Sequence, residues 1–600
     1  MSDITEKNQE EKDMEQYFFR ASAEDFGKIP GSPIAYWPSN HMRDSFGNHN
    51  SLGEIARPKQ GLATTDNGRF LRYWFECLER KSCFTAIDSE SALESERKWF
   101  PCQKGGGFRK WYGNNDYLVN WENDGEEIKK IVIDRYGSAS KRVVNEHLYF
   151  KQGITWSTLS SSSLSMRYVA QGFIFETKGS MCFFDNEETL FSSIAFCNTN
   201  IVNPLLQCIS PTLDFHEGPV GKLPIASRIS SIVVKNSVLA IAFSKQDWDG
   251  NELSWDFSEL PLLSANYKTS YLKQSYGKIR VHWSKITLNL QQLEQENNRI
   301  FIEAYGLQDE LTPEVPLKEI TLTCNPHYRY KGEKSDEELE ALLLADTMRE
   351  FISYAVGCMF GRYSLDKEGL ILANQGDTLA EYFAKTGTVG LATQEHGNEG
   401  VSPSFMPDED NVIPLIDFEG DWFEDDISER FKQFLKVTFG EANFAENLSF
   451  IEKAIGKDIK KFFLKDFYAD HVKRYKKRPI YWLFSSQKGS FNALVYIHRY
   501  QPDTASIVLN DYLREFRTKL EARKESYEQV EISASASQKD KTQAIKAITK
   551  INKVLEEVND YEHDVLYPLA GKKIDIDLDD GVKHNYPLFG KALKKVTGLS

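Results

Sequence analysis

Long apolar runs and paired cysteines are both missing from this chain of 600 residues. No run approaches the roughly 20 apolar residues that a bilayer-spanning helix needs, and the first residues are polar and acidic, unlike a secretory leader. The eight cysteines never form a C-x-x-C pair. This usage is typical of a reduced cytosolic protein and argues against a structural zinc site. We therefore expect a cytoplasmic protein with no membrane partner and no bound metal.

Strings that mark several enzyme classes are also missing. The sequence contains no H-E-x-x-H, no G-x-S-x-G and no G-x-x-x-x-G-K-S/T. A nuclease would need carboxylates and a lysine around a metal ion. Asp408 and Asp410 have no following E-x-K, and the acidic run 577–583 is more typical of a solvated strand. His471 and His498 lack Cys or carboxylate partners at ligand spacing, so we expect them to be structural.

Positive charge is in deficit, since the formal net charge is −15. Any binding of nucleic acid must therefore come from local basic patches and not from a general positive field. Aromatic residues are abundant, with 27 Tyr and 38 Phe, which suits either large cores or base-stacking surfaces. The length predicts several domains, about two to four.

The hydrophobic patterns predict an α+β multidomain fold, in which a mixed α/β domain precedes a helical spacer and a mainly helical C-terminal domain. Strands are expected to dominate 128–245. The expected divisions are a polar helix at 1–28, the mixed domain at 29–250, the spacer at 251–310, a C-terminal α/β domain at 311–500, and a helical hairpin with a final strand at 501–600. The clearest expected elements are helices from about Leu288 to 305, at 335–363 and at 427–470, a hairpin of 507–528 with 540–566, strands at Ile320–Thr323 and 574–579, and a long loop or lid at 385–420.

The stretch Lys98–Gly125 interleaves aromatic and basic residues, with three Trp, two Tyr and two Phe. Lys104 precedes Gly105–Gly107, whose bare backbone can approach a phosphate chain. Arg109 and Lys110 can neutralise phosphates, and an arginine can also form a paired hydrogen bond to guanine. The alternative is a hairpin with aromatic core residues. Three amides of the type that pairs with adenine lie in the same stretch: Asn114, Asn115 and Asn120.

Two further basic clusters are candidates for DNA contact. Around the turn at 64–68, four cations form a polar loop that is equally typical of a solvated surface. Near residue 475, five cations lie within six positions among aromatics, in an otherwise acidic chain. That density favours phosphate contact, and a solvated helix end is the alternative. The candidate residues are Arg57, Lys59, Arg69 and Arg72 in the first cluster, and Lys473, Arg474, Lys476, Lys477 and Arg478 in the second.

One short string, Asn325-Pro326-His327-Tyr328, resembles a catalytic motif. Amino-methyltransferases use Asn/Asp-Pro-Pro-Tyr/Phe, in which the side-chain oxygen and a carbonyl accept hydrogen bonds from the exocyclic amine and the aromatic ring stacks on the flipped base. Here His327 replaces the second proline, and no glycine-rich loop of the F/D-x-G-x-G kind follows a strand. Asn325 and Tyr328 are therefore weak catalytic candidates, and a strand running into a turn is the favoured interpretation.

Several long strings resemble the PglX family, the adenine-specific DNA methyltransferases of BREX phage defence. They cover essentially the whole chain from Phe19 onward, and strings of this length are specific. The matching segments are Phe19–Trp37, Ile55–Trp74, Trp99–Gly125, Ser244–Phe257, Asn298–Pro313, Asp346–Asp366, Arg474–Tyr500 and Asp575–Ser600.

The resemblance implies a part of a longer protein. Family members are about twice as long and carry a Rossmann-type methyltransferase with its own Asn-Pro-Pro-Tyr motif ahead of the matching region. The chain is accordingly expected to be a C-terminal half that contains the target recognition domain, a helical spacer and a C-terminal domain.

From the resemblance we expect double-stranded DNA, a methyltransferase-domain partner or missing N-terminal half, and other BREX proteins as partners. S-adenosylmethionine would bind in the missing half, and this chain would bind no cofactor. Two alternatives stay open. The chain could methylate adenine by itself through Asn325 and Tyr328, or it could act as an interaction scaffold for BREX components.

Overall fold

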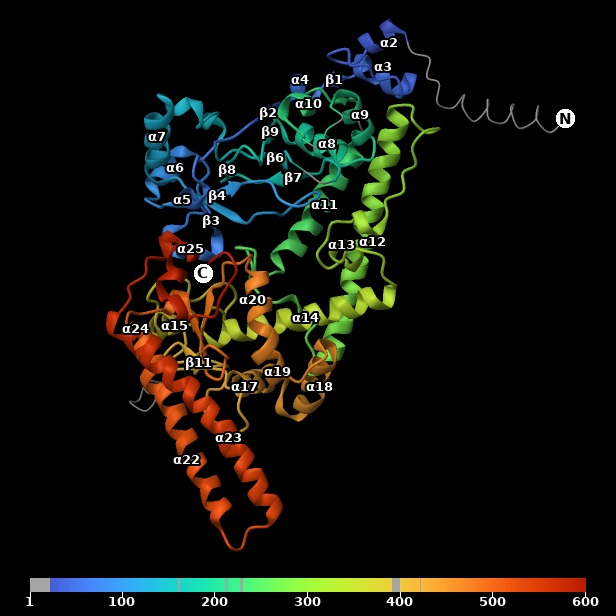
Figure 1. Cartoon of the computed structure of the whole chain (residues 1–600). Helices are drawn as coiled ribbons and strands as arrows, with labels where there is room; N and C mark the ends of the chain where they lie inside the picture. Colours follow the sequence, from blue (N-terminus) through green and yellow to red (C-terminus); the bar gives the residue numbers. More distant parts are fainter. Residues whose placement is uncertain are drawn as a thin grey trace, which may run out of the picture. The chain divides into compact units, whose positions relative to one another are not determined.

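The computed structural model describes residues 22–159, 162–210, 212, 214–226, 230–390, 400–420 and 422–599. Contacts between Cα atoms divide the chain into two compact units. Unit 1 comprises Met1–Leu71, Cys83–Trp248 and His282–Gly332, and unit 2 comprises Arg72–Ser82, Asp249–Val281 and Glu333–Ser600. Both units combine helices with small sheets (Figure 1), so the mixed α/β class is confirmed. The narrower domain limits expected from the sequence stay predictions.

Unit 1 begins with short helices that hydroxyl side chains cap. Ser22 and Ser39 accept backbone hydrogen bonds at the starts of α2 (Ala23–Gly27) and α3 (Asn40–Asn48), which satisfies amides that the first helical turn leaves unpaired. The rest of the helix expected at 1–28 lies outside the described residues. Beside α4 (Leu52–Ile55), the two-residue strand β1 (Asn50–Ser51) pairs antiparallel with β10 (Pro224–Ile225).

Two sheets form the strand-rich part of unit 1. In the first, the antiparallel strands follow the order β2-β9-β6-β7. The second is built on the antiparallel pair β4–β5, to which β8 adds a parallel strand. Their aromatic and aliphatic side chains are mostly buried on both faces, which explains why the segments read as apolar runs. The strands are β2 (Arg57–Lys59), β9 (Met181–Phe183), β6 (Gly153–Trp156), β7 (Met166–Val169), β4 (Trp99–Gln103), β5 (Tyr117–Asn120) and β8 (Ile174–Phe175).

Helices take over from residue 187 onward, so the prediction that strands dominate 128–245 is wrong for its second half. Apolar residues three or four positions apart, such as Leu190 and Ile194, bury one helix face in the core of unit 1. From residue 187 onward these helices are α8 (Glu187–Cys197), α9 (Val202–Ile209), α10 (Glu217–Gly221), α11 (Ser231–Asp249) and α13 (Pro326–Arg329). Shorter or isolated helices precede them among the strands: α5 (Asn67–Phe70), α6 (Ser89–Glu94) and α7 (Glu122–Tyr136).

The long helix α12 (Leu272–Ala304) confirms the predicted helix in this segment but begins well before Leu288, and its role as a spacer stays a prediction. Ile286 and Leu290 are buried, whereas Leu288 between them is exposed. That pattern looks like strand alternation in the sequence, but the spacing of four residues also places Ile286 and Leu290 on one face of a helix.

Unit 2 is mainly helical around one small sheet. The helix α14 (Asp336–Met359) starts at a capping box formed by Ser335 and Glu338, as its acidic first turn indicates. The sheet has the antiparallel order β11-β13-β12. The predicted hairpin is confirmed by α22 and α23, which lie side by side in Figure 1. The bounds are β11 (Val412–Pro414), β12 (Tyr481–Ser485), β13 (Asn492–Tyr496), α15 (Leu379–Thr386), α17 (Ile427–Phe439), α18 (Phe444–Ile455), α19 (Ile459–Phe462), α20 (Tyr468–Arg474), α21 (Thr504–Ile507), α22 (Arg514–Ile532), α23 (Gln538–Tyr561), α24 (Tyr567–Lys572) and α25 (Val582–Asn585).

Two predicted strands are absent from the described residues. Ile320–Thr323 is irregular between a 3₁₀ turn at Leu317–Glu319 and α13, because the Leu322 amide bonds locally to the Ile320 carbonyl and the Thr323 amide donates to the Asp247 side chain instead of to a neighbouring strand. Residues 574–577 alternate in burial without a partner strand and run into a 3₁₀ turn at Leu578–Asp580. In the expected loop at 385–420, residues 391–399 lie outside the described part, and β11 follows at 412.

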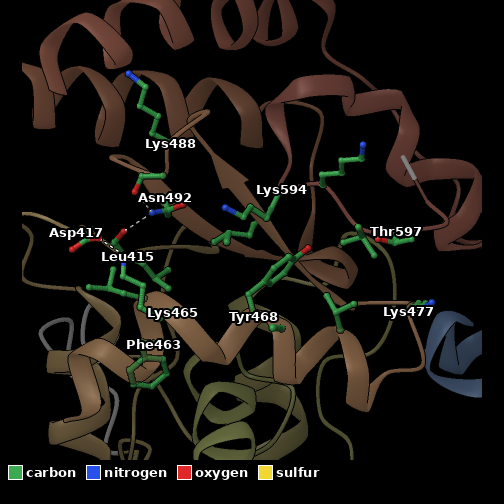
Figure 2. A pocket seen from close by; sticks show the side chains of 17 residues that line it. Leu415, Asp417, Phe463, Lys465, Tyr468, Lys477, Lys488, Asn492, Lys594 and Thr597 are labelled. Carbon is green, nitrogen blue, oxygen red and sulfur yellow. Dashed lines mark hydrogen bonds and ion pairs between the residues drawn. The ribbon is translucent and has the colours of Figure 1, made fainter. Parts of the chain in front are cut away.

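An open pocket of about 590 Å³ lies beside the β12–β13 hairpin in unit 2 (Figure 2). It is lined by residues from α20, the hairpin and the segment after residue 593. None of the described helices carries an apolar stretch that could cross a lipid bilayer.

His471 and His498 are structural, as the sequence predicts. The Nε2 atom of His471 accepts hydrogen bonds from the Ile480 and Tyr481 amides at 3.2 and 3.1 Å. Burial lowers the pKa of His471 well below its ordinary value and lowers the pKa of His498 to about 3. Both imidazoles are therefore neutral in the folded protein, and their protonation favours unfolding.

We expect unit 2 to become less stable as the pH falls below about 6.5, the ordinary histidine pKa. The unfolded chain then binds protons that the folded chain does not. Each buried histidine therefore lowers the free energy of unfolding by up to ~1.4 kcal/mol per pH unit. Urea unfolding at neutral and mildly acidic pH measures this slope. His498→Gln should reduce it, and His147→Gln, at an exposed position, should leave it unchanged. Equal slopes for H498Q and the parent chain would contradict the assignment.

Candidate nucleic-acid interface

The glycines that follow β4 are required by the fold of unit 1. Gly105 and Gly106 have φ values of +80° and +144°. A Cβ atom on Gly105 would lie 2.5 Å from the Lys178 carbonyl oxygen, and one on Gly106 would lie 2.6 Å from the Asn114 side chain. Gly107 alone has open space around it. The close approach that the glycines permit is therefore an approach to this chain's own atoms, with an exposed tip at Gly107.

The asparagines of the same stretch are engaged within unit 1. Asn114 donates to the Gly107 carbonyl at 2.9 Å, Asn115 accepts from Gln103 at 2.9 Å, and Asn120 donates to Glu127 at 2.9 Å. Their amides stabilise turns and helix ends, and base pairing with adenine would require these hydrogen bonds to break.

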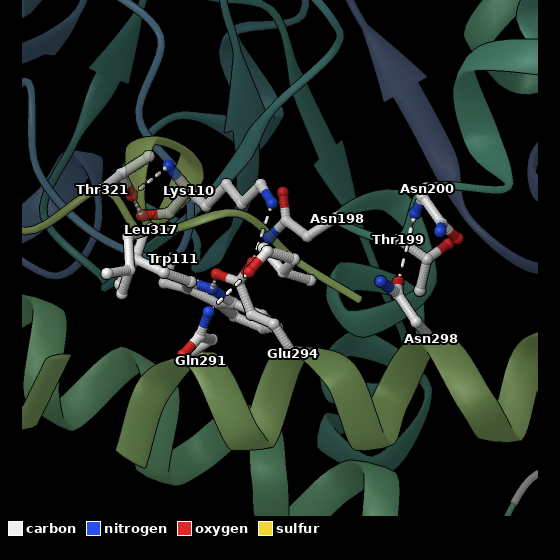
Figure 3. A network of polar contacts seen from close by, with 12 residues as sticks. Lys110, Trp111, Asn198, Thr199, Asn200, Gln291, Glu294, Asn298, Leu317 and Thr321 are labelled. Carbon is white, nitrogen blue, oxygen red and sulfur yellow. Dashed lines mark hydrogen bonds and ion pairs between the residues drawn. The ribbon is translucent and has the colours of Figure 1, made fainter. Parts of the chain in front are cut away.

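Lys110 and Trp111 converge on one buried carboxylate, that of Glu294 in α12 (Figure 3). The Lys110 Nζ donates to Oε2 and the Trp111 Nε1 donates to Oε1, both at 2.8 Å. The Lys110 amide also donates to Thr321 Oγ1 at 3.0 Å. Since Lys110, Trp111 and Glu294 are each under one-tenth exposed, the ion pair is compensated by further hydrogen bonds, the condition under which a buried pair is tolerated.

Arg109 is held in a second buried cluster. Its guanidinium donates to Thr323 Oγ1 at 2.7 Å and pairs with Asp247 at 3.5 Å. The rings of Trp248 and Tyr328 lie 5.0 and 5.8 Å from its central carbon, which is cation–π distance. Asp247 also accepts the Thr323 and Cys324 amides at 2.6 and 2.8 Å. This arrangement fixes Arg109 in the interior, with only 6% of the residue exposed.

Arg167 is a buried cation that no sequence pattern indicates. Its Nη1 donates to the Arg109 carbonyl at 3.4 Å, and burial together with Arg109 lowers its pKa to about 10. An isolated arginine on a strand gives no sequence signal that would separate it from the exposed ones. With Arg109 and Lys110 it forms an interior row of positive charge in unit 1.

Arg57 and Arg69 are the exposed candidates of unit 1. Arg57 pairs with Asp185 at 2.9 Å and Arg69 pairs with Glu127, and both guanidinium side chains are more than half exposed. Exposed pairs of this kind contribute only ~0–1 kcal/mol, so a phosphate can replace the carboxylate at small cost. Lys59 and Lys104 are half-buried, and Lys104 lies 3.6 Å from Glu176.

In unit 2, some residues of the second basic cluster are exposed and others are largely buried. Lys473 and Lys477 are exposed. Arg474 is nearly buried against carboxylates, of which Asp470 is 3.0 Å away, and Arg478 lies 3.8 Å from the buried Glu76. The remaining member is Lys476, whose amine lies 5.4 Å from the Tyr73 ring. Arg72 of the first cluster also belongs to unit 2, where it is buried and donates to the carbonyls of Asp579 and Asp580 at 3.1 and 3.0 Å.

The near-motif at Asn325 caps a short helix. Its side-chain oxygen accepts from the His327 amide at 3.2 Å at the start of α13, and its Nδ2 donates to the carbonyls of Leu317 and Ile320, each at 2.8 Å. Tyr328 donates to the Phe108 carbonyl. The amide that would hold an adenine amine is 1% exposed and engaged in local hydrogen bonds.

Acidic and metal-ligating residues form no metal site in the part of the chain that the structure describes. Asp408 is buried, and burial together with neighbouring Asp410 raises its pKa well above the ordinary value. Tyr512 donates to Asp410 and Asp425 at 2.9 and 2.7 Å. This group belongs to the interior of unit 2.

No protein-family model matches the chain. Two curated proteins match it along nearly its whole length. An adenine-specific methyltransferase PglX from Lacticaseibacillus casei (strain Zhang) is 36% identical over 587 residues, 95% of this chain and 45% of that protein. An adenine-specific methyltransferase BrxX from Escherichia coli O9:H4 (strain HS) is 36% identical over 602 residues, 96% of this chain and 46% of that protein.

The chain therefore belongs to the PglX/BrxX family of adenine-specific methyltransferases, the family that its long strings resemble. It spans slightly less than half the length of these two relatives. That it corresponds to their C-terminal half, and that its cations contact DNA, stay predictions from the sequence.

We expect Glu294→Gln to destabilise unit 1 by ~3 kcal/mol, because it leaves the Lys110 ammonium buried without its counter-charge. Glu296→Gln is the matched control, since Glu296 lies on the same helix and pairs with Arg299 at the surface. It should cost less than ~1 kcal/mol. Chemical denaturation followed by tryptophan fluorescence measures the free energy of unfolding of both variants. Equal costs would show that the buried pair contributes no more than the exposed one.

Proposed function

We propose that this chain is the target-recognition part of an adenine-specific DNA methyltransferase of BREX phage defence. The observation that carries the proposal is the 36% identity over 95% of the chain to an adenine-specific methyltransferase more than twice as long. A chain that spans less than half of its relatives can supply one of their tasks and leave another to the remaining sequence.

The local chemistry favours a role in recognition over one in catalysis. Asn325 has the residue type of a methyltransferase motif, but its amide is used to cap α13 and to bond Leu317 and Ile320. The sequence offers no strand followed by a glycine-rich loop that would hold S-adenosylmethionine. We therefore assign cofactor binding and methyl transfer to a methyltransferase-domain partner or to a missing N-terminal half.

Contact with DNA falls to the exposed cations in this proposal. Arg57, Arg69, Lys473 and Lys477 are exposed and can reach a phosphate without unfolding their surroundings. Arg109 and Lys110 hold the loop after β4 in shape from within, because their charges are compensated by Asp247 and Glu294. They act as positioning residues for the exposed tip at Gly107.

S-adenosylmethionine should give no heat when it is titrated into the purified chain by calorimetry, with or without duplex DNA. A separately prepared methyltransferase half of the Lacticaseibacillus relative should bind the cofactor under the same conditions. Stoichiometric binding by this chain alone would favour the alternative in which it is a methyltransferase itself, and Asn325→Ala would then be the variant to compare.

Removal of two exposed arginines should weaken DNA binding and its salt dependence together. For Arg57→Ala combined with Arg69→Ala, the slope of log affinity against log salt should fall by about 0.9 for each phosphate that is no longer neutralised. Fluorescence anisotropy with a labelled duplex at several salt concentrations measures the slope. Arg299→Ala is the matched control, because its side chain is also about half exposed and ion-paired on unit 1.

An unchanged slope for R57A/R69A would remove these two residues from the interface. A duplex affinity that is independent of salt in the parent chain would favour the interaction-scaffold alternative, since phosphate contacts always release counterions.

A further inference from the structure

The pocket beside the β12–β13 hairpin concentrates positive charge in an acidic protein. Five lysines and one aspartate line it, and its other lining residues are uncharged. Since the whole chain has a net charge of −15, this local excess of lysine contrasts with the average surface. All five lysines are exposed: Lys465, Lys477, Lys488, Lys594 and Lys595.

Most of this charge is uncompensated. Lys465 pairs with the lining aspartate, Asp417, at 2.5 Å. Within the described residues, no ion pair or hydrogen bond engages the amines of the other four lysines. Like charges brought together around one cavity repel one another, so an anionic ligand there would relieve that repulsion and would also make direct contacts.

The backbone that carries these lysines is held firmly. Glu557 of α23 accepts the Lys488 amide at 2.6 Å and the Ser486 hydroxyl at 2.7 Å, which fixes the hairpin turn. The Lys594 amide donates to the Leu483 carbonyl of β12 at 2.8 Å. Lys477 follows the end of α20, where its amide donates to the Val472 carbonyl at 2.8 Å. Hydrogen bonds to neighbouring segments therefore fix the backbone positions of Lys477, Lys488 and Lys594.

The floor of the pocket is apolar and aromatic. Tyr468 lies there with its hydroxyl 2.9 Å from that of Tyr586, and Leu415 and Leu483 add aliphatic surface. In Figure 2 the Lys594 side chain extends over this floor toward Asn492. A cavity of about 590 Å³ falls in the size range of small-ligand sites. A cationic rim over an aromatic floor suits a ligand with several phosphates and one planar group.

We propose that this pocket binds a free nucleoside polyphosphate, with the phosphates at the lysine rim and the base over Tyr468. Lysine ammonium groups bind phosphate as point charges and tolerate several ligand orientations. A nucleotide that belongs to a DNA strand would offer the same phosphate chemistry. The concave shape favours a free ligand, because a duplex backbone is convex and contacts a strip of surface. The inference goes beyond the proposed function and does not depend on it. Lys477 appears both among the proposed DNA contacts and in this pocket, so the test below varies Lys594 and Lys595 instead.

The test uses a fluorescent ATP analogue, without divalent metal, and the full chain. Saturable one-to-one binding is expected. Lys594→Ala combined with Lys595→Ala should weaken it about tenfold or more, because two ammonium groups no longer face the phosphates. The matched control is Lys539→Ala combined with Lys546→Ala, which removes two exposed lysines of α23 that do not line the pocket. Thermal melts of both variants establish that they fold.

Competition experiments distinguish a free nucleotide from duplex DNA as the source of the bound phosphate. Unlabelled ATP should displace the analogue, and adenosine, which lacks phosphates, should not. The proposal is overturned if the analogue does not bind saturably, if both double variants weaken binding equally, or if duplex DNA displaces it at lower concentration than ATP. A failure of the R57A/R69A experiment would remove the proposed arginine contacts with DNA and leave this result untouched.

Discussion

Two carboxylates, Glu294 and Asp247, neutralise the buried cations of the loop after β4, and the shape of unit 1 depends on them. A buried lysine or arginine without a counter-charge would cost several kcal/mol, on the order of the whole stability of a domain. Each carboxylate also accepts hydrogen bonds from other groups, Glu294 from Trp111 and Asp247 from two backbone amides. The loop, α11, α12 and the segment before α13 are therefore fixed by shared acceptors as well as by apolar contact.

Because buried carboxylates can neutralise cations in the interior, residue type alone is a poor guide to which cations of this protein could contact DNA. Arg109 and Lys110 have the composition of a DNA-binding loop, yet their partners lie 138 and 184 residues away in the sequence. Nothing local distinguishes them from Arg57 or Arg69, which are exposed. Only the three-dimensional arrangement separates cations that support the loop from cations that can meet a ligand.

Elements with local signals could be predicted from the sequence. The capping box at Ser335, the acidic first turn and the regular apolar spacing define α14, and the stripes of α22 and α23 define the hairpin. The strands expected at Ile320–Thr323 and 574–579 were wrong because alternation alone does not provide a partner strand.

The basic pocket could not be predicted at all beyond Lys477. Three of its lysines lie within 465–488 and the other two at 594–595, more than one hundred residues further along the chain, and each lies in a stretch that looks like ordinary solvated surface. The pairing of β12 with β13, together with the bridge between Phe484 and Leu593, assembles them. Long-range pairing of this kind leaves no trace in local composition, whereas the family strings span the chain and could be recognised directly.

The turn after α20 has a consequence for any attempt to stabilise the protein. Lys476 and Lys477 have φ values of +53° and +60°, a left-handed conformation that favours glycine. Each costs on the order of 1 kcal/mol relative to a relaxed backbone. Glycine in place of Lys477 would relieve this strain and at the same time remove an exposed ammonium group from the surface of unit 2. Selection for thermal stability alone would therefore favour the loss of positive charge from this surface.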